Sequence, residues 1–110
     1  MKFLVFLNEK ANRPETDWAA LNRSIREHVS RMLEDGTLDC AHYVLPNRGV
    51  CIMNASSHEV LLSQLRSWPA YSHHNFEIYP LCNIFQAIDD NFGRVPPPAG
   101  TAAGQQGGST

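Results

Sequence analysis

The sequence predicts a single α+β domain whose strands and helices follow the order βαββαβ. Two long segments repeat apolar residues at the 3.6-residue spacing of a helix, and four short segments have the composition of strands. The chain has 110 residues, 43% of them hydrophobic and 18% charged, which is enough apolar material for one packed core. This composition excludes a fibrous or wholly disordered main body.

The first predicted strand is residues 2–8, which carry apolar side chains on both faces. Apolar residues on both faces favour a central strand that is covered twice. The predicted helix that follows runs from Trp18 to Leu33, after several N-cap candidates in residues 12–17. Gly36 ends it, because a helix end favours a residue that adopts left-handed backbone.

The middle of the chain predicts two strands that are adjacent in sequence. They span residues 40–45 and 50–54, and residues 46–49 form the turn between them. Together with one strand before and one after, they make an antiparallel four-stranded sheet. The order βαββαβ is that of the ferredoxin-like fold.

The second predicted helix begins at a capping box formed by Ser56 and Glu59. Pro69 ends this helix, because proline cannot continue the helical hydrogen bonds. The last predicted strand is residues 75–81, and it contains Pro80. Proline is tolerated only at an edge or an end of a sheet, so this strand is expected at the edge.

The fold predicts self-association. Two helices cover one face of a ferredoxin-like sheet, and the other face stays apolar in this sequence, for example at Val50 and Ile52. An apolar patch of that size is expected to be buried against a second copy, as in a dimeric α+β barrel. Residues 1–92 are expected to form this domain, and residues 93–110 a flexible C-terminal tail rich in proline and glycine.

Charge and hydropathy exclude several classes of partner. Nine basic against eleven acidic residues give a net charge of −2, which provides neither a nucleic-acid footprint nor a polybasic membrane anchor. The longest apolar run, residues 3–7, is too short for a bilayer span or a signal peptide. We therefore expect a cytoplasmic protein whose partners are a small-molecule substrate and its own copies.

The chemistry that remains is acid–base chemistry of side chains. Cys40, Cys51 and Cys82 lack metal-ligand spacing and are expected to be reduced and mostly buried thiols, so we expect no metal and no cofactor. Phosphate-binding loops, nucleophile elbows and nucleotide fingerprints are also missing from the sequence. The reaction type that we expect is therefore proton transfer by side chains in an apolar pocket.

Histidines and tyrosines are the candidate catalytic groups. His28 lies on the apolar stripe of the first helix, where a histidine can be either an acid–base group or a satisfied core residue. His42 and Tyr43 alternate on the second strand, so their side chains point to opposite faces. His73 and His74 precede the last strand, in a segment that can equally be a solvated loop.

Apolar and aromatic residues are the candidate walls of a substrate pocket. Tyr71, like Tyr43, can donate a hydrogen bond to a developing enolate. Glu77 is expected to face the apolar sheet surface and to pair across subunits. The expected substrate-binding residues are Phe6, Leu21, Ile25, Met32, Trp68 and Tyr71.

Two segments of the chain resemble the muconolactone isomerases. Trp68-Pro69-Ala70-Tyr71 falls on Leu-Pro-Leu-Phe of that family, and Glu77 falls on a glutamate in its last strand. Gly36 matches the glycine that closes its first helix. The resemblance covers about residues 1–88 and implies a ferredoxin-like oligomer.

The departures from the muconolactone isomerases concern the site. His42-Tyr43 stands where they carry Trp-Arg, and Ile84-Phe85 stands where they carry His-Pro. Ile25 occupies the position of an acidic residue. These differences suggest a related proton transfer on another small cyclic or polyketide-like molecule.

The leading hypothesis is a cofactor-independent isomerase or cyclase acting on a small unsaturated lactone, aromatic or polyketide-like ring. His28, together with His42 or with His73 and His74, would move a proton next to a carbonyl group. One alternative is a cofactorless monooxygenase, because oxygenases of the antibiotic-biosynthesis type resemble the same barrel. The other is a non-catalytic oligomer that binds a small ligand.

Overall fold

The computed structural model describes residues 1–94 and has the βαββαβ order that the sequence predicts, followed by one more helix. The expected tail lies outside the described residues, apart from its first two. The elements are β1 (Lys2–Glu9), α1 (Trp18–Glu34), β2 (Leu38–Val44), β3 (Arg48–Asn54), α2 (His58–Arg66), the 3₁₀ turn η1 (Tyr71–His73), β4 (His74–Leu81) and α3 (Ile84–Arg94).

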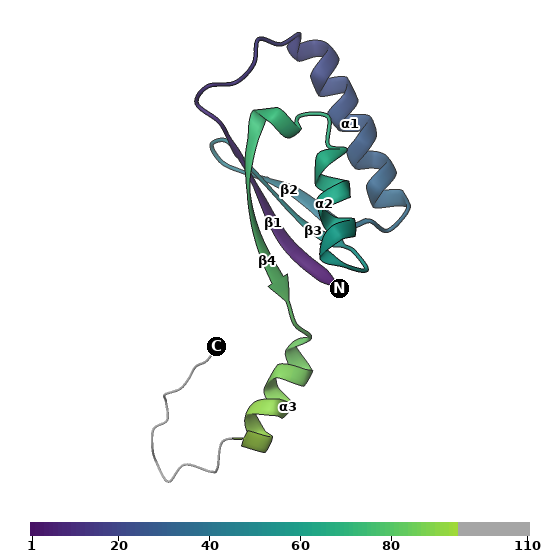
Figure 1. Cartoon of the computed structure of the whole chain (residues 1–110), viewed down its shortest axis with the longest axis vertical. Coiled ribbons are helices and arrows are strands. Elements are labelled where there is room, and N and C mark those ends of the chain that lie inside the picture. The colour runs from purple at the N-terminus through teal and green to yellow at the C-terminus, as the bar shows by residue number, and fades with distance from the viewer. Residues whose placement is uncertain (95–110) are drawn as a thin grey trace.

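The four strands form one antiparallel sheet in the order β2-β3-β1-β4, which confirms the ferredoxin-like prediction. β1 is central, as its two apolar faces predicted. β4 is an edge strand, which accommodates Pro80. Figure 1 shows α1 and α2 lying together against one face of the sheet.

The core lies between that face and the two helices. Phe3 and Val5 alternate into it from β1, and Val5 is fully buried. Met53 meets them from β3, and Leu61 and Leu65 from one side of α2. This packing fixes which residues of every strand face the helices, because partners across antiparallel strands point the same way.

Capping residues position both helices over the sheet. Asp17 accepts a hydrogen bond from the backbone N–H of Ala20 at 3.1 Å, and Gly36 follows α1 with a φ of 83°. The cap of α2 is Ser57, whereas the sequence suggested Ser56. Ser57 has extended backbone, and its Oγ accepts from the N–H of Val60 at 3.1 Å.

Within residues 1–94, neither α1 nor α2 covers the second face of the sheet. Leu4 and Phe6 point to this face, opposite to the neighbouring Phe3 and Val5. Arg48 lies over the Phe6 ring, with its guanidinium carbon 4.4 Å from the ring centroid.

Glu77 belongs to this face but is paired within its own chain, whereas the sequence suggested a partner across subunits. Its carboxylate accepts hydrogen bonds from Asn8 at 2.6 Å and Tyr79 at 3.0 Å, and it lies 3.6 Å from Arg48. The Asn8 hydrogen bond, then that from Tyr79, holds the pKa of Glu77 below its usual value.

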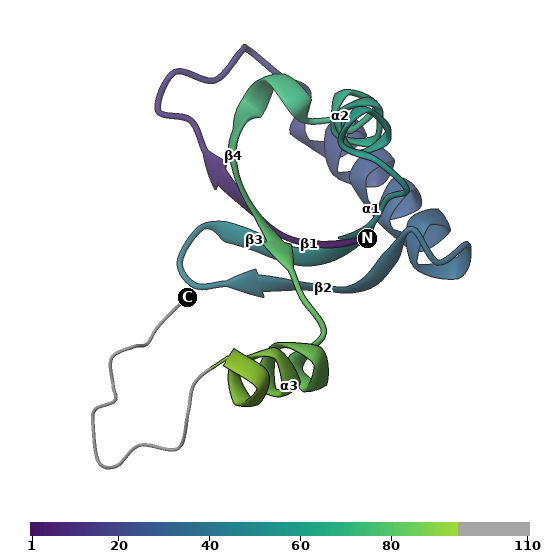
Figure 2. The same cartoon turned by 60° about the horizontal axis from the view of Figure 1, so that its bottom comes forward.

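The helix α3 was not predicted from the sequence. Figures 1 and 2 both show it apart from α1 and α2, beyond the end of β4. Ile84 and Phe85 are 63% and 72% exposed, so the described chain leaves them without a core to enter. The helix also crosses the domain boundary expected at residue 92.

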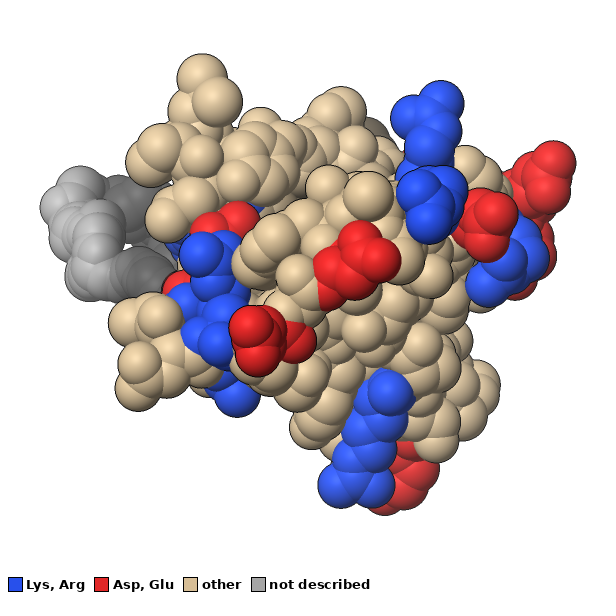
Figure 3. Space-filling view, turned by 90° about the horizontal axis from the view of Figure 1, so that it is seen from above, with Lys and Arg blue, Asp and Glu red and all other residues tan. Residues whose placement is uncertain are grey.

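Charged side chains of both signs lie on the described surface, and the three cysteines differ in burial. Figure 3 shows basic and acidic side chains interspersed on the face it presents. In residues 1–94 the cysteines are free, with Cys51 buried and Cys40 half-buried, but Cys82 is exposed, contrary to expectation. None of the helices in this part of the chain is long and apolar enough to span a membrane.

Candidate functional site

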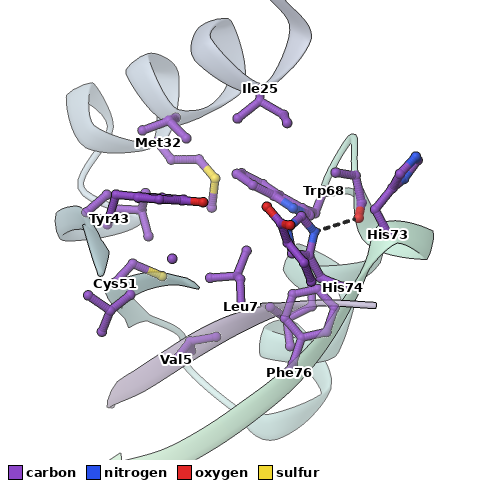
Figure 4. A pocket seen from close by; sticks show the side chains of 18 of the residues that line it. Val5, Leu7, Ile25, Met32, Tyr43, Cys51, Trp68, His73, His74 and Phe76 are labelled. Atoms are coloured by element: carbon purple, nitrogen blue, oxygen red, sulfur yellow. Dashed lines mark hydrogen bonds between the residues drawn. The ribbon is translucent and has the colours of Figure 1, made fainter. Parts of the chain in front are cut away.

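A cavity of about 480 Å³ lies between the helix-covered face of the sheet and helix α1. Figure 4 shows Ile25 and Met32 of α1 on one side of it and Val5 and Leu7 of β1 on the other. Its size and largely apolar walls are those of a site for a small organic molecule. The residues around it come from β1, α1, β2, β3, α2 and the segment that enters β4.

Strand pairing decides which polar side chains enter this cavity. Tyr43 in β2 pairs with Gly49, which pairs with Leu7, so all three are on the helix-covered face. His74 at the start of β4 pairs with Glu9 and therefore shares that face. The two edge strands of the sheet thus supply one tyrosine and one histidine to opposite sides of the same cavity.

Eight of the eleven candidate catalytic and substrate-binding residues line the cavity. Tyr43 and Trp68 reach into it from opposite sides in Figure 4. The full set is Leu21, Ile25, Met32, His42, Tyr43, Trp68, His73 and His74.

His42 borders the cavity, but its side chain belongs to the other face of the sheet. It pairs with Val50, which pairs with Phe6, and Phe6 points away from the helices. His42 is exposed there. Its strand neighbour Tyr43 is also exposed, at 59%, but lies on the face of the sheet that borders the cavity.

Phe6 and Tyr71 were expected as pocket walls and are outside the cavity lining. Phe6 lies on the uncovered sheet face, where the Tyr79 ring meets it edge-on at 6.2 Å. Tyr71 is exposed and stacks on Phe76, with ring centroids 5.7 Å apart. Phe76 is the aromatic residue of this pair that reaches the cavity.

His28 packs behind the cavity wall and does not line it. Its ring meets the Trp68 indole edge-on at 5.5 Å, so it supports the side of Trp68. Burial, then the nearby Arg31, lowers the pKa of His28, while Asp35 opposes the shift. His28 is therefore partly buried outside the cavity, but it is not the satisfied core residue that the sequence allowed, because its Nε2 is buried without a hydrogen-bond partner within residues 1–94.

The tautomer of His74 follows from its partner. Its Nδ1 lies 3.0 Å from the carbonyl oxygen of Ala70 (Figure 4). A carbonyl oxygen only accepts, so Nδ1 carries the hydrogen and donates it. When the ring is neutral, Nε2 then has the free lone pair, which is the atom a general base needs.

His73 has the other tautomer, for a similar reason. Thr16 donates its one hydroxyl hydrogen to the carbonyl of Pro14 at 2.7 Å, so its oxygen accepts from Nε2 of His73, also at 2.7 Å. The His73 ring is turned away from the cavity centre in Figure 4 and meets Trp18 edge-on at 5.7 Å. This histidine holds the segment before α1 in place.

Gln64 is a cavity residue that the sequence reasoning missed. Its Nε2 donates to the carbonyl of Asn54 at 3.2 Å, which fixes the amide orientation. Within residues 1–94 its Oε1 is buried without a hydrogen-bond partner, as is Nε1 of Trp68. A polar residue among the apolar positions Leu61, Leu65 and Trp68 was the available signal.

The charged groups at the cavity neutralise one another. Arg13 donates to Glu9 at 3.0 Å, and its guanidinium carbon lies 5.1 Å from the centroid of the Trp18 ring. In the part of the chain that the structure describes, histidine, cysteine and acidic residues form no group of three that could hold a metal ion. The polar groups that line the otherwise apolar cavity are therefore mostly neutral ones.

Comparison with known proteins supports the architecture. No family model and no curated protein sequence matches the chain. Among solved structures, muconolactone isomerase superposes with a TM-score of 0.65 and 20% identity, covering 76% of this chain and 90% of the isomerase.

A second similar structure is 5-chloro-2-hydroxyhydroquinone dehydrochlorinase from Burkholderia phenoliruptrix, in complex with 2,5-dihydroxybenzoquinone. It has a TM-score of 0.59 and 11% identity, covering 78% of this chain and 98% of the other. At these identities the likeness concerns the fold. The chain shares the ferredoxin-like α+β fold of muconolactone isomerase, and the resemblance seen in the sequence is confirmed at that level.

Proposed function

We propose that the protein is a cofactor-independent isomerase or cyclase that moves a proton on a small unsaturated lactone, aromatic or polyketide-like ring. The observation that carries this proposal is the Nδ1–H of His74 bonded to Ala70, which leaves Nε2 as the basic atom at an apolar cavity. His74 is the proposed acid–base group, a role for which the sequence analysis had named four candidate histidines.

The proposed reaction uses two residues. Nε2 of His74 removes a proton from a ring carbon next to a carbonyl group, and the electrons of the broken C–H bond pass into an enolate. The hydroxyl group of Tyr43 donates a hydrogen bond to the enolate oxygen. The protonated His74 then returns the proton to another carbon of the conjugated system, so the enzyme ends the cycle unchanged.

The apolar walls support a ring as substrate. Ile25, Met32 and Leu7 offer apolar surface on two sides of the cavity. A cavity near 480 Å³ is large enough for a substituted ring. Both similar structures act on or bind ring compounds by their names, which agrees with this proposal and does not define the substrate.

The test is the isomerisation of two simple probes, cyclohex-3-enone and α-angelica lactone, whose products are conjugated and absorb in the ultraviolet. We expect the protein to accelerate at least one of them. His74→Gln should lower kcat about a hundredfold or more, because positioned acid–base groups contribute about 10²–10⁴-fold. Tyr43→Phe should lower kcat with a smaller change in KM, because its hydrogen bond forms to the enolate.

His58→Gln is the matched control, since His58 is an exposed histidine at the start of α2 and outside the cavity. It should keep the activity of the unsubstituted protein. Equal rates for His74→Gln and His58→Gln would contradict the proposal. Oxygen consumption with a hydroquinone and no isomerisation would favour the monooxygenase, and binding without either reaction would favour the ligand-binding oligomer.

We also propose that the protein self-associates through its uncovered sheet face and α3. Apolar surface on that face comes from Phe6, Val50 and Ile52. Helix α3, which follows the edge strand β4 in the sequence, adds the exposed side chains of Ile84 and Phe85. Surface of this kind is normally buried against another chain. Free cysteines in the described residues suit a reducing compartment, and we propose the cytoplasm.

A further inference from the structure

We propose that helix α3 of a second copy covers the open side of the cavity beside Tyr43, so that two chains together complete each site. The inference rests on the proposed function, because it takes the cavity as the substrate site and the chain as self-associating. It goes beyond both by stating which surfaces of the two copies meet, namely the turn at Leu45 in one chain and the side of α3 that carries Phe85 in the other.

The cavity is open to solvent where Tyr43 contributes to it. Tyr43 lines the cavity and is 59% exposed, and Leu45, at the start of the β2–β3 turn, is 84% exposed. This exposure means that the rest of residues 1–94 does not cover either side chain. A hydrogen bond from Tyr43 to an enolate is strongest where water is excluded, so the proposed chemistry is favoured by a second chain at this place.

Helix α3 has an exposed apolar side that is suited to cover such an opening. Ile84 and Phe85 are 63% and 72% exposed, and Ile88, one turn further along, is 43% exposed. Residues three or four positions apart lie on the same side of a helix, so these three side chains form one continuous surface. An amphipathic helix of this kind normally buries its apolar side against another surface.

The α3 helix of the same chain begins at the wrong end of the sheet to reach Tyr43. β4 ends at Leu81, which pairs with Lys2, and α3 begins at Ile84. Tyr43 is level with Leu7, five residues along β1 from Lys2, which is a distance of about 17 Å in a strand. Figure 1 shows α3 continuing beyond the end of β4 and not turning back along the sheet.

The charges of the uncovered sheet face favour a second copy as the partner. Lys2 lies 2.6 Å from Asp39 at one end of this face, and Arg48 lies 3.6 Å from Glu77 towards the other. A face that meets its own copy across a two-fold axis repels itself if it carries an excess of one charge. Ion pairs within the chain avoid that repulsion around the apolar surface at Phe6, whereas they offer little to a strongly charged partner.

The exposed apolar residues also indicate how the two copies are related. A two-fold axis that crosses the strands places the end of β4 in one copy beside the β2–β3 turn of the other. In Figure 2 the strands lie between α3 and the other two helices, so α3 is already on the side where the second copy would be. An axis along the strands would keep α3 of both copies at the far end of the sheet from Leu45, and both apolar surfaces would stay exposed.

The experiment joins the two surfaces by a disulfide in the full chain. The variant combines Leu45→Cys and Phe85→Cys with Cys82→Ser, which removes the exposed native thiol. After oxidation with diamide at micromolar concentration, we expect a two-chain product in which position 45 of one chain is linked to position 85 of the other. Non-reducing electrophoresis and peptide mass spectrometry identify this product.

The matched control replaces Leu45→Cys by Leu62→Cys, because Leu62 is also exposed but lies on α2. The two-chain product should form at least about tenfold faster in the first variant, since groups held side by side react at an effective concentration near millimolar. Sedimentation velocity shows whether the reduced variants assemble. Ile88→Cys replaces Phe85→Cys if the latter prevents assembly.

Three results would overturn the inference. They are a disulfide between positions 45 and 85 within one chain, a rate no faster than that of the Leu62→Cys control, and a protein that remains a single chain. The link is independent of catalysis, so it separates the inference from the proposed isomerase. The link without isomerisation of the probes would overturn the proposed function alone, and isomerisation without the link would overturn the inference alone.

Discussion

At the scale of single residues, hydrogen-bond partners decide what each histidine can do. The carbonyl of Ala70 makes Nδ1 of His74 a donor and leaves Nε2 as the base, whereas the hydroxyl of Thr16 uses Nε2 of His73. These partners are four and 57 residues away in the chain. The sequence could nominate both histidines, but it could not distinguish the base from the residue that holds a loop.

The altered pKa of His28 predicts a specific pH dependence of stability. Burial lowers this pKa below the ordinary 6.5, so the unfolded state binds the proton more readily than the folded state. As the pH falls through 6.5 towards the folded pKa, the free energy of unfolding decreases. His28→Gln removes this contribution. The free energy of unfolding of the variant, relative to that of the unsubstituted protein, should therefore increase as the pH falls from about 8 to about 5.5.

Urea unfolding at those two pH values measures the effect of His28. His58→Gln is the control for the loss of an exposed histidine. A stability difference between the protein and His28→Gln that is the same at both pH values would contradict the assignment of His28 to a partly buried position.

Thiol reactivity is a second prediction at this scale. Burial, followed by the proximity of Cys40, raises the pKa of Cys51 to about 11, so it holds almost no reactive thiolate near neutral pH. Cys82 is exposed. Iodoacetamide should therefore modify Cys82 first and Cys51 only after unfolding, as peptide mass spectrometry would show. Labelling in denaturant is the control, and equal labelling rates in the folded protein would contradict the prediction.

At the scale of elements, α1 forms one wall of the cavity and depends on its N-terminal cap. Asp17→Ala removes the 3.1 Å hydrogen bond to Ala20 and should lower the free energy of unfolding by about 1 kcal/mol. Asn12→Ala, in the exposed loop before the helix, is the matched control. Chemical denaturation that gives the same stability for both variants would show that the cap contributes nothing.

Most elements could be predicted because their causes are local. The apolar period of α1, the glycine after it and the proline in β4 each act within a few residues. Helix α3 was missed because Asp89 and Asp90 within it suggested a solvated turn, and Ile84 and Phe85 remain exposed in residues 1–94. The wall position of Phe6 was wrong for a different reason, because strand alternation alone does not say which face the helices cover.

At the scale of the whole molecule, the exposed apolar surface predicts an assembly. In sedimentation velocity at micromolar concentration, the protein should have a mass at least twice the 12.3 kDa of one chain. Phe85→Asp should weaken the assembly, because it places a charge on the exposed side of α3. Leu62→Asp, on the exposed surface of α2, is the control. A folded species of 12.3 kDa would contradict this prediction.

The arrangement of the whole molecule also explains why the site was only partly predictable. The cavity combines two edge strands of one sheet with residues from both α1 and α2. Leu21 and Ile25 could be assigned to it from the period of their helix. His74 and Tyr43 come together only through the order β2-β3-β1-β4, and Gln64 only through the packing of α2.

The central claim is that His74 removes and returns a proton at a ring carbon inside this cavity. The most direct measurement follows the cyclohex-3-enone probe in deuterium oxide by nuclear magnetic resonance, with the protein, with His74→Gln and without protein. The account predicts that the protein accelerates conversion to the conjugated ketone, that any deuterium taken up appears at the carbon that receives the proton, and that His74→Gln abolishes the acceleration. Conversion at the uncatalysed rate, or unchanged conversion with folded His74→Gln, would contradict the account.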